Sequence, residues 1–359
     1  MDKRTAKQEG IVVVAGIDLA KNVFGVHGVD HRGEPVLRRR LRRDQLLAEF
    51  ANRPPCLIGL EACSGAHYWA RELAKLGHTA RIMAPEFVKP FRKSRHSKND
   101  ANDAEAIAIA VQQRNMRFVP VKSVDQQAVL VPHRVRQGFL AERTAAINRL
   151  RGLLSEFGLV LPQSVAKLRR GLAPWLAPDE QGLPEPMKAC AIELLEHLDV
   201  LEARIARYER LILEQARASE PARRAMTLRG IGPITAAAAQ ATVTVPTAFK
   251  NGRQFAAWLG MVPKQHSSGD KVLLGAITRR GDTYLRTLLI QGARSALQAA
   301  RNRAPDRHDR LSSWIVQLYA RVGYHKALVG IANKHARILW AILVKGESFN
   351  PALPNVHRA

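Results

Sequence analysis

The first third of the chain carries short apolar runs in which hydrophobic and polar positions follow one another as they do in β-strands. Three such runs lie between Ile11 and Arg43, with turn-forming Asp30, Gly33 and Pro35 between the last two. The predicted strands are IVVVAGID, NVFGVHGVD, PVLRRRLRR, CLIGLEA and HTARIMA, and the predicted helices are DQLLAEFAN, HYWARELAKLG and ANDAEAIAIAVQQ. Strands mixed with helices predict an α/β domain with a mixed sheet over residues 11–125.

From residue 126 to 219 the pattern changes to long helical runs. Leu, Ile and Val recur every three or four residues, with charges between them. A stretch rich in Pro and Gly separates two such runs, which predicts an antiparallel helical pair of coiled-coil character acting as a connector. Residues 220–345 are predicted to form a mainly helical domain, interrupted by a segment bearing Gly and Ser from Gly260 to Gly275. Residues 1–10 and 346–359 are expected to be tails.

The chain is strongly basic. Its 56 Lys and Arg residues against 31 Asp and Glu residues give a formal net charge of +25 over 359 residues. Such an excess repels itself in a compact fold, and nucleic acid is the natural polyanion to neutralise it. A polybasic membrane binder is the alternative, but we find no apolar run of the ~20 residues that a membrane span needs. Three cysteines without C-x-x-C spacing, and no signal peptide, predict a cytoplasmic protein.

Four acidic residues stand at the ends of predicted elements. Asp18 and Glu61 each end a predicted strand, and Asp100 and Asp103 begin a predicted helix at i, i+3 spacing. If the first and fourth strands are neighbours, these carboxylates converge, and divalent cations would relieve their repulsion. Two Mg²⁺ ions, for which Mn²⁺ can substitute, are the usual device for phosphodiester chemistry. The alternative is that the two strand-end residues have no further role and that the two aspartates cap the helix.

Basic clusters and one glycine motif are candidates for nucleic-acid contact, since each neutralised phosphate adds salt-dependent affinity. For the basic runs, the alternative is an ordinary solvated surface. In LRGIGPITA, a tight turn can expose backbone N–H groups to a phosphate, or the glycines can simply pack two helices closely. The candidate residues in these clusters are Arg38, Arg39, Arg40, Arg92, Lys93, Arg95, Lys98, Arg134, Arg136, Gly230 and Gly232.

Several motifs, in this order along the chain, carry a family resemblance: GIDLAKN, LEACSGAHYWARELAKLGH, SKNDANDAEAIA, NRLRGLLSEFG, LRGIGPITAAA, FAAWLGMVPKQHSSGDK and ITRRGDTYLRTLL. With them the sequence resembles the DEDD-type insertion-sequence transposases of the IS110 family and its IS1111 subgroup. The resemblance implies a RuvC-like N-terminal domain of ribonuclease-H fold, whose four acids map onto Asp18, Glu61, Asp100 and Asp103. It implies a bacterial, nucleoid-associated DNA transposase that acts on element ends and target. A structured bridge RNA as guide is implied as well.

The resemblance also implies a serine nucleophile before a glycine, which maps onto Ser268, with Ser267 as the fallback. A hydroxyl attacks a phosphodiester only if its proton is removed and positive charge holds the phosphate. Local candidates for that charge are Lys264, His266, Lys271, Arg279 and Arg280. Attack would leave a phosphoserine link to DNA. Taken alone, Ser-Ser-Gly is typical of a polar turn, and Asp270 adds a negative charge that many relatives lack.

Two other function classes remain open. A RuvC-like structure-specific endonuclease would use the acidic site with water as nucleophile, and a non-catalytic nucleic-acid-binding protein would use the charge alone. For the transposase we expect a homo-oligomer, dimer or tetramer, assembled through the helical connector so that DNA ends are brought together.

Overall fold

The computed structural model describes residues 10–92, 100–177, 182–268 and 271–351. Its internal contacts divide the chain into two compact units, Met1–Ser123 (unit 1) and Val124–Ala359 (unit 2).

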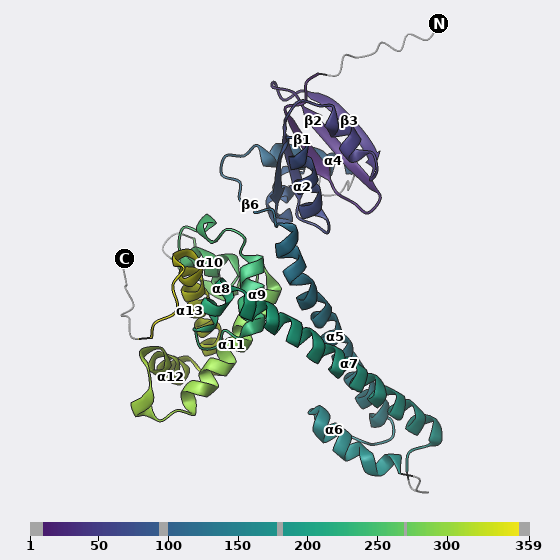
Figure 1. The fold of residues 1–359 in the computed structure, drawn as a ribbon, viewed down its shortest axis with the longest axis vertical. Coiled ribbons are helices and arrows are strands. Elements are labelled where there is room, and N and C mark those ends of the chain that lie inside the picture. Colours follow the sequence, from purple (N-terminus) through teal and green to yellow (C-terminus); the bar gives the residue numbers. More distant parts are fainter. Residues whose placement is uncertain (1–9, 93–99, 178–181, 269–270, 352–359) are drawn as a thin grey trace. The chain divides into compact units, whose positions relative to one another are not determined.

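Unit 1 is a mixed sheet with helices on both of its faces (Figure 1). All five strands predicted from the sequence form, and a short sixth strand follows them. The strands are β1 (Val14–Asp18), β2 (Val23–Val29), β3 (Pro35–Arg42), β4 (Leu57–Glu61), β5 (Thr79–Met83) and β6 (Phe118–Val119). The helices are α1 (Leu46–Ala51), α2 (Ala66–Lys75), α3 (Pro85–Val88), the short 3-10 helix η1 (Lys89–Phe91) and α4 (Asp100–Val111).

The strand order is β3-β2-β1-β4-β5-β6, so β1 and β4 are neighbours although three elements separate them in the chain. β1 runs antiparallel to β2 and parallel to β4. The condition under which Asp18 and Glu61 converge, that the first and fourth strands are neighbours, is thus met. The order is consistent with a ribonuclease-H-like domain. One face of the sheet packs on α1 and α2 through large apolar side chains, including Phe24, Phe50 and Trp69.

The other face of the sheet carries α4 in very close contact. A Cβ atom on Gly16 would lie 2.1 Å from the carbonyl oxygen of Ala104, and one on Gly59 would lie 2.9 Å from Cβ of Val111. Only glycine at these two strand positions lets the helix backbone approach so closely. α4 is therefore pressed onto the centre of the sheet, and its first turn lies near the ends of β1 and β4.

Unit 2 is mainly helical. Its helices are α5 (Val124–Ser155), α6 (Val165–Leu172), η2 (Ala173–Leu176), α7 (Glu185–Ala218), α8 (Glu220–Met226), α9 (Pro233–Thr242), η3 (Pro246–Ala248), α10 (Gly252–Trp258), α11 (Thr283–Arg301), η4 (Pro305–Arg307), α12 (Arg310–Val322) and α13 (Tyr324–Lys345). Helices α8 to α13 enclose an alanine- and leucine-rich core, to which the C-terminal end of α7 contributes Ile212 and Ala216.

Two of these helices, α5 and α7, run antiparallel along each other (Figure 1). Near one end of the pair Arg136 forms an ion pair with Glu209, with 2.6 Å between their nitrogen and oxygen atoms. Near the other end Leu154 of α5 and Met187 of α7 share a small apolar cluster with α6. The predicted pair of long helices thus forms, and the described part of the Pro- and Gly-rich stretch between them contains α6 and η2.

Two sequence expectations need correction. The segment from Gly260 to Gly275 was expected only to interrupt helices, but it contains the strand β7 (Pro263–Gln265), which pairs with β8 (Leu274–Ile277) as an antiparallel hairpin.

No apolar run long enough to span a membrane was expected, but α13, with 22 residues, meets that criterion by length and composition. One face of α13 packs in the core of unit 2 through Leu328, Ile331 and Leu339, which explains its apolar character.

Candidate functional site

The acidic residues meet where β1 and β4 end. Ile17 pairs with Leu60, so Asp18 and Glu61, the next residue of each strand, emerge side by side from adjacent parallel strands. Asp103 lies on the first turn of α4, over the same face, and is only 7% exposed. Asp100 is the first residue of α4, and its side chain lies outside the described part of the structure. The fold therefore brings three of the four predicted acids to one edge of the sheet.

Arg92 lies between two of these carboxylates. Its Nε is 3.0 Å from Oδ1 of Asp103, and a terminal nitrogen is 3.5 Å from Oε2 of Glu61. Burial raises the pKa of Glu61, the Arg92 charge opposes that rise, and the Asp103 charge adds to it. Burial and the charges of Asp18 and Glu61 likewise raise the pKa of the Cys63 thiol. These carboxylates are close enough to repel one another, and a guanidinium offsets part of their charge.

The donor chemistry suits a hard divalent cation, because carboxylate oxygens are the ligands that Mg²⁺ prefers. Within the described residues, no group of three His, Cys, Asp or Glu side chains is arranged to hold a metal ion. The guanidinium of Arg92 supplies positive charge next to the carboxylates of Glu61 and Asp103. The carboxylates thus suit such a cation by the chemistry of their oxygens, and Arg92 occupies space beside two of them.

The basic run on β3 divides between the two faces of the sheet. Arg39 points to the α1 side, where a terminal nitrogen lies 2.8 Å from Oε2 of Glu49. Arg38 and Arg40 lie on the α4 side, paired across the ladder with His27 and Gly25. Alternation along a strand produces this division, so a run of arginines in sequence is not a single patch in space.

The other predicted phosphate contacts of the first half have different surroundings. Lys93, Arg95 and Lys98 lie outside the described residues. Arg136 is largely buried in its ion pair with Glu209, whereas Arg134 is exposed, with its guanidinium 5.7 Å from the ring centroid of Tyr284.

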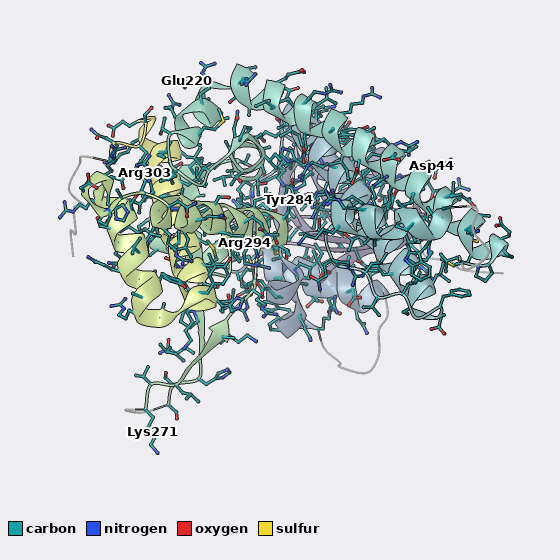
Figure 2. The ribbon with its side chains drawn as sticks, turned by 90° about the horizontal axis from the view of Figure 1, so that it is seen from below. Asp44, Glu220, Lys271, Tyr284, Arg294 and Arg303 are labelled. Atoms are coloured by element: carbon teal, nitrogen blue, oxygen red, sulfur yellow. The ribbon has the colours of Figure 1, made fainter. Side chains whose placement is uncertain are left out.

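The predicted nucleophile lies on the β7–β8 hairpin. Ser268 is exposed and pairs with Lys271 across the hairpin, while Gly269 and Asp270 lie outside the described residues. The hairpin extends away from the helices of unit 2, with Lys271 at its far end (Figure 2). Lys264 and His266 are exposed on the same hairpin. The serine and its basic neighbours are thus displayed to solvent.

The base of the hairpin is held by a residue that the sequence analysis missed. Arg286 of α11 is 7% exposed and donates hydrogen bonds to the carbonyl oxygens of Leu259 (2.9 Å) and Arg280 (2.7 Å). Arg279 has a positive φ of 57°, a strained conformation for a residue other than glycine. No local pattern signals this clamp, because the partners of Arg286 are backbone atoms.

The glycine motif forms a tight turn between α8 and α9. Gly230 has φ +91°, and a Cβ atom there would lie 2.6 Å from the carbonyl oxygen of Gly292 on α11. Close packing therefore explains this glycine. Gly232 is exposed at the start of α9, and nothing would lie within 4 Å of a Cβ atom there. The open side of the turn is thus at Gly232.

Comparisons with known proteins agree along almost the whole chain. A family model described as "Transposase IS116/IS110/IS902 family" matches residues 222–309, and DEDD_Tnp_IS110, described as "Transposase", matches residues 15–158. A "Probable family 20 transposase" of Pseudomonas aeruginosa is 48% identical over 94% of this chain and 98% of its own length. The "Transposase for insertion sequence element IS1111A" of Coxiella burnetii is 38% identical over 94% of this chain and 91% of its own length. The chain therefore belongs to the IS110 family of insertion-sequence transposases.

Proposed function

We propose that this transposase excises and inserts its element by a covalent route, with Ser268 as nucleophile and a Mg²⁺-assisted carboxylate site. The observation that carries the acidic half is the convergence of Asp18 and Glu61 from adjacent parallel strands with Asp103 from α4. An exposed serine on a basic hairpin supports the other half.

In this proposal Asp18, Glu61, Asp100 and Asp103 hold Mg²⁺, with two ions in the complete complex and Mn²⁺ able to substitute. When bound, the metal supplies positive charge that stabilises a phosphodiester under attack. The carboxylates themselves fix where that charge sits, because Asp18 and Glu61 are anchored on neighbouring strands. The close contact of α4 with Gly16 likewise fixes the position of Asp103 relative to the sheet.

The chemistry of Ser268 follows from its hydroxyl. Oγ forms a bond to phosphorus, the bond between phosphorus and a deoxyribose oxygen breaks, and the serine proton ends on the oxygen that leaves. The products are the two ends of the cut strand, one joined to the protein as a phosphoserine ester and the other carrying a free deoxyribose hydroxyl. Attack by a deoxyribose hydroxyl reverses the step and rejoins DNA. Lys264, His266, Lys271, Arg279 and Arg280 supply positive charge for the phosphate.

The architecture supports further parts of the proposal. The order β3-β2-β1-β4-β5 supports a RuvC-like assignment for the sheet domain. The antiparallel contact of α5 and α7 supports a coiled-coil connector that assembles a dimer or tetramer around DNA ends. The charge of +25 supports binding of two polyanions, the DNA and a structured RNA that selects the target by base pairing.

The test is to incubate the full chain with DNA of its own element, the flanking RNA and Mg²⁺, then quench with denaturant and look for a protein–DNA adduct. We expect an adduct in the wild type and in Ser267→Ala, and none in Ser268→Ala, Asp18→Asn or without metal. An adduct that disappears in Ser267→Ala instead would move the nucleophile by one residue. Metal-dependent cleavage with no adduct in any form would overturn the serine mechanism in favour of a water-using endonuclease.

A further inference from the structure

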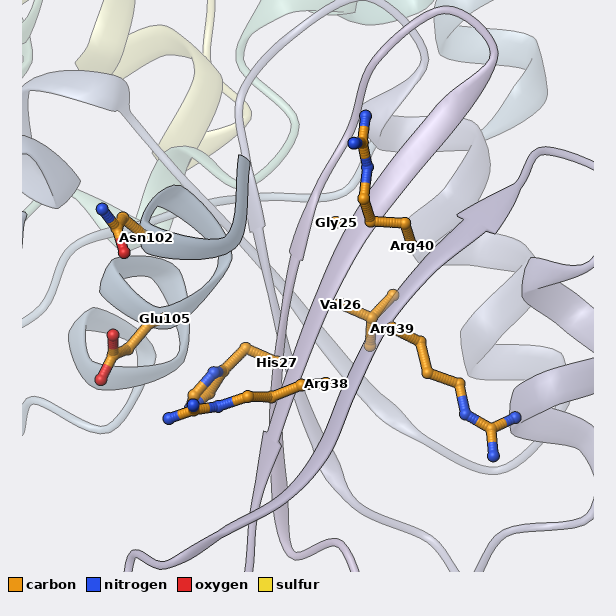
Figure 3. Close-up of a pocket in the computed structure, with 8 residues that line it drawn as sticks. All are labelled: Gly25, Val26, His27, Arg38, Arg39, Arg40, Asn102 and Glu105. Carbon is orange, nitrogen blue, oxygen red and sulfur yellow. The ribbon is translucent and has the colours of Figure 1, made fainter. Parts of the chain in front are cut away.

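A cavity of about 230 Å³ lies on the α4 side of the sheet, between β2, β3 and the first turns of α4. Figure 3 shows the residues that line it. They are Gly25, Val26 and His27 from β2, Arg38, Arg39 and Arg40 from β3, and Asn102 and Glu105 from α4. Arg38 lies alongside His27 and points toward α4, whereas Arg39 points the opposite way (Figure 3).

The strand register explains why the cavity is open. Gly25 pairs with Arg40 on one side and with Asp18 on the other, so these three residues form one row across the sheet. Residues paired across a ladder share a face, and the middle one has no side chain to fill the space. Asp18 and Arg40 are two strand spacings apart, about 10 Å between backbones. The cavity is therefore next to the acidic site on the same face.

Helix α4 connects the two places directly. Asp103 belongs to the acidic site. Its neighbour Asn102 lines the cavity, and so does Glu105, which lies about half a turn after Asp103. Because successive residues of a helix differ by about 100° in direction, one turn can serve both sites. The close contact at Gly16 fixes this helix against the sheet and so fixes the spacing of the two sites.

The lining selects for an anion of modest size. Of the three lining arginines, Arg38 and Arg40 lie on the α4 side of the sheet, as does the imidazole of His27, which is 5% exposed. Across the cavity α4 contributes Asn102 and a single carboxylate, Glu105, which offsets one positive charge. Guanidinium groups match the geometry of phosphate oxygens. A volume near 230 Å³ is below that of a drug-sized ligand site, so it suits one phosphate group rather than a whole cofactor.

We propose that this cavity binds a phosphate of the same nucleic-acid strand whose scissile phosphate lies at Asp18, Glu61 and Asp103. Arg38 and Arg40 hold the phosphate, His27 and Asn102 shape its seat, and Glu105 limits the affinity so that the strand can leave. The inference rests on the proposed function, in which the acidic site acts on a DNA phosphodiester. It adds a second anchor point that sets where along the strand the acidic site acts.

The test measures binding without catalysis. The full-length Ser268→Ala chain is titrated in a chelator with an oligothymidylate and, separately, an oligouridylate of equal length, over a series of salt concentrations. We expect Arg38→Gln and Arg40→Gln to weaken binding and to flatten the salt dependence, by about 0.7 in the log–log slope for each phosphate that is no longer bound. Arg114→Gln is the control: it makes the same charge change at an exposed arginine in the turn after α4 that does not line the cavity, and it should keep the wild-type slope.

A second variant predicts the opposite sign. Glu105→Gln removes the opposing charge from the cavity and should tighten binding of the oligonucleotide. A loss of oligothymidylate binding supports the inference, whereas a loss confined to oligouridylate would overturn it, because the scissile strand is DNA. Wild-type binding of oligothymidylate by Arg38→Gln and Arg40→Gln, or an equal loss in Arg114→Gln, would overturn the inference. Because neither metal nor Ser268 is present, the result is independent of the adduct test, and each can fail alone.

Discussion

The guanidinium of Arg92 and the carboxylate of Asp103 form an ion pair, with 3.0 Å between Nε and Oδ1. The same guanidinium reaches Glu61 at 3.5 Å. Arg92 directly precedes the segment from Lys93 to Lys98, which carries several more cations. A positive side chain of the protein thus lies beside two of the residues that are proposed to hold Mg²⁺, and it would compete with that ion for the same carboxylates.

Replacing Arg92 with Gln should strengthen Mg²⁺ binding. The metal would no longer have to displace a guanidinium, and roughly a threefold to tenfold gain in affinity is expected for a partly exposed pair. Titration calorimetry of the full chain with MgCl₂ gives the affinity. Lys89→Gln, an exposed lysine of the same segment, is the control and should leave the affinity unchanged. Weaker binding in Arg92→Gln would mean that the arginine organises the carboxylates instead of competing for them.

Gly16→Ala should destabilise unit 1. Its Cβ atom would lie 2.1 Å from the carbonyl oxygen of Ala104, so α4 must move away from the sheet, at a cost of about 3 kcal/mol. Denaturant unfolding followed by circular dichroism measures the loss. Gly152→Ala provides the contrast, because it is exposed on α5 with nothing within 4 Å, and alanine there should add up to about 1 kcal/mol. Unchanged stability in Gly16→Ala would show that α4 adjusts freely.

Buried histidines should make unit 2 sensitive to acid. Burial, with help from Arg136 and Arg134, lowers the pKa of His133 to about 4. Above pH 6.5 the ring is neutral in both the folded and the unfolded chain. As the pH falls from 6.5 toward 4 the unfolded chain takes up the proton first, so folded stability is lost, by roughly 3 kcal/mol at most.

The loss is measured as the difference in thermal unfolding midpoint between pH 7.5 and pH 5.0. His133→Gln keeps a polar group near the Tyr284 hydroxyl, which lies 2.9 Å from Nδ1, but it cannot titrate. Its midpoint should therefore fall less between the two pH values than that of the wild type. An equal fall of the midpoint in His133→Gln and in the wild type would assign the acid sensitivity to other groups. The next residue to replace would then be His335, because burial lowers its pKa to about 4 as well.

Arg286→Met should impair the placement of Ser268 without weakening DNA binding. The change removes charge-assisted hydrogen bonds to two carbonyl oxygens at the base of the hairpin, worth about 2 kcal/mol or more. The rate of adduct formation at saturating DNA should fall, while the dissociation constant for DNA stays near the wild-type value. Arg286→Lys should recover part of the rate. An equal loss of rate and affinity in both variants would indicate general misfolding of the hairpin region.

The sequence pattern predicted five of the six strands of unit 1 because each of these places a large apolar side chain, such as Ile17 or Leu60, in a core. The same reasoning missed β7 and β8, whose residues are almost all exposed. Strands that bury neither face lack the alternation by which strands are recognised. The hairpin depends on backbone pairing and on the Arg286 clamp, which leave no mark on hydrophobic periodicity.

The candidate acidic residues could also be named from the sequence, since Asp18 and Glu61 stand at the ends of apolar runs. Their closeness depended on β1 and β4 being neighbours, which the pattern itself does not fix. The contact of Arg92 with Glu61 and Asp103 could not be foreseen, because it joins residues from separate elements through side-chain placement. Arg38 and Arg39 lie on opposite faces of the sheet because of the strand register. The cavity beside Arg38 could therefore not be predicted from the sequence pattern either.

The close seat of α4 on Gly16 and Gly59 bears on how copies of such an element decay in a genome. Consider a copy that keeps every carboxylate and the serine but has alanine at either glycine. It would encode an enzyme in which α4 can no longer pack closely on the sheet. Surveys that count intact catalytic motifs would then overestimate the number of mobile copies. Gly16 and Gly59 would then distinguish active copies from inactive ones, as the acidic residues do.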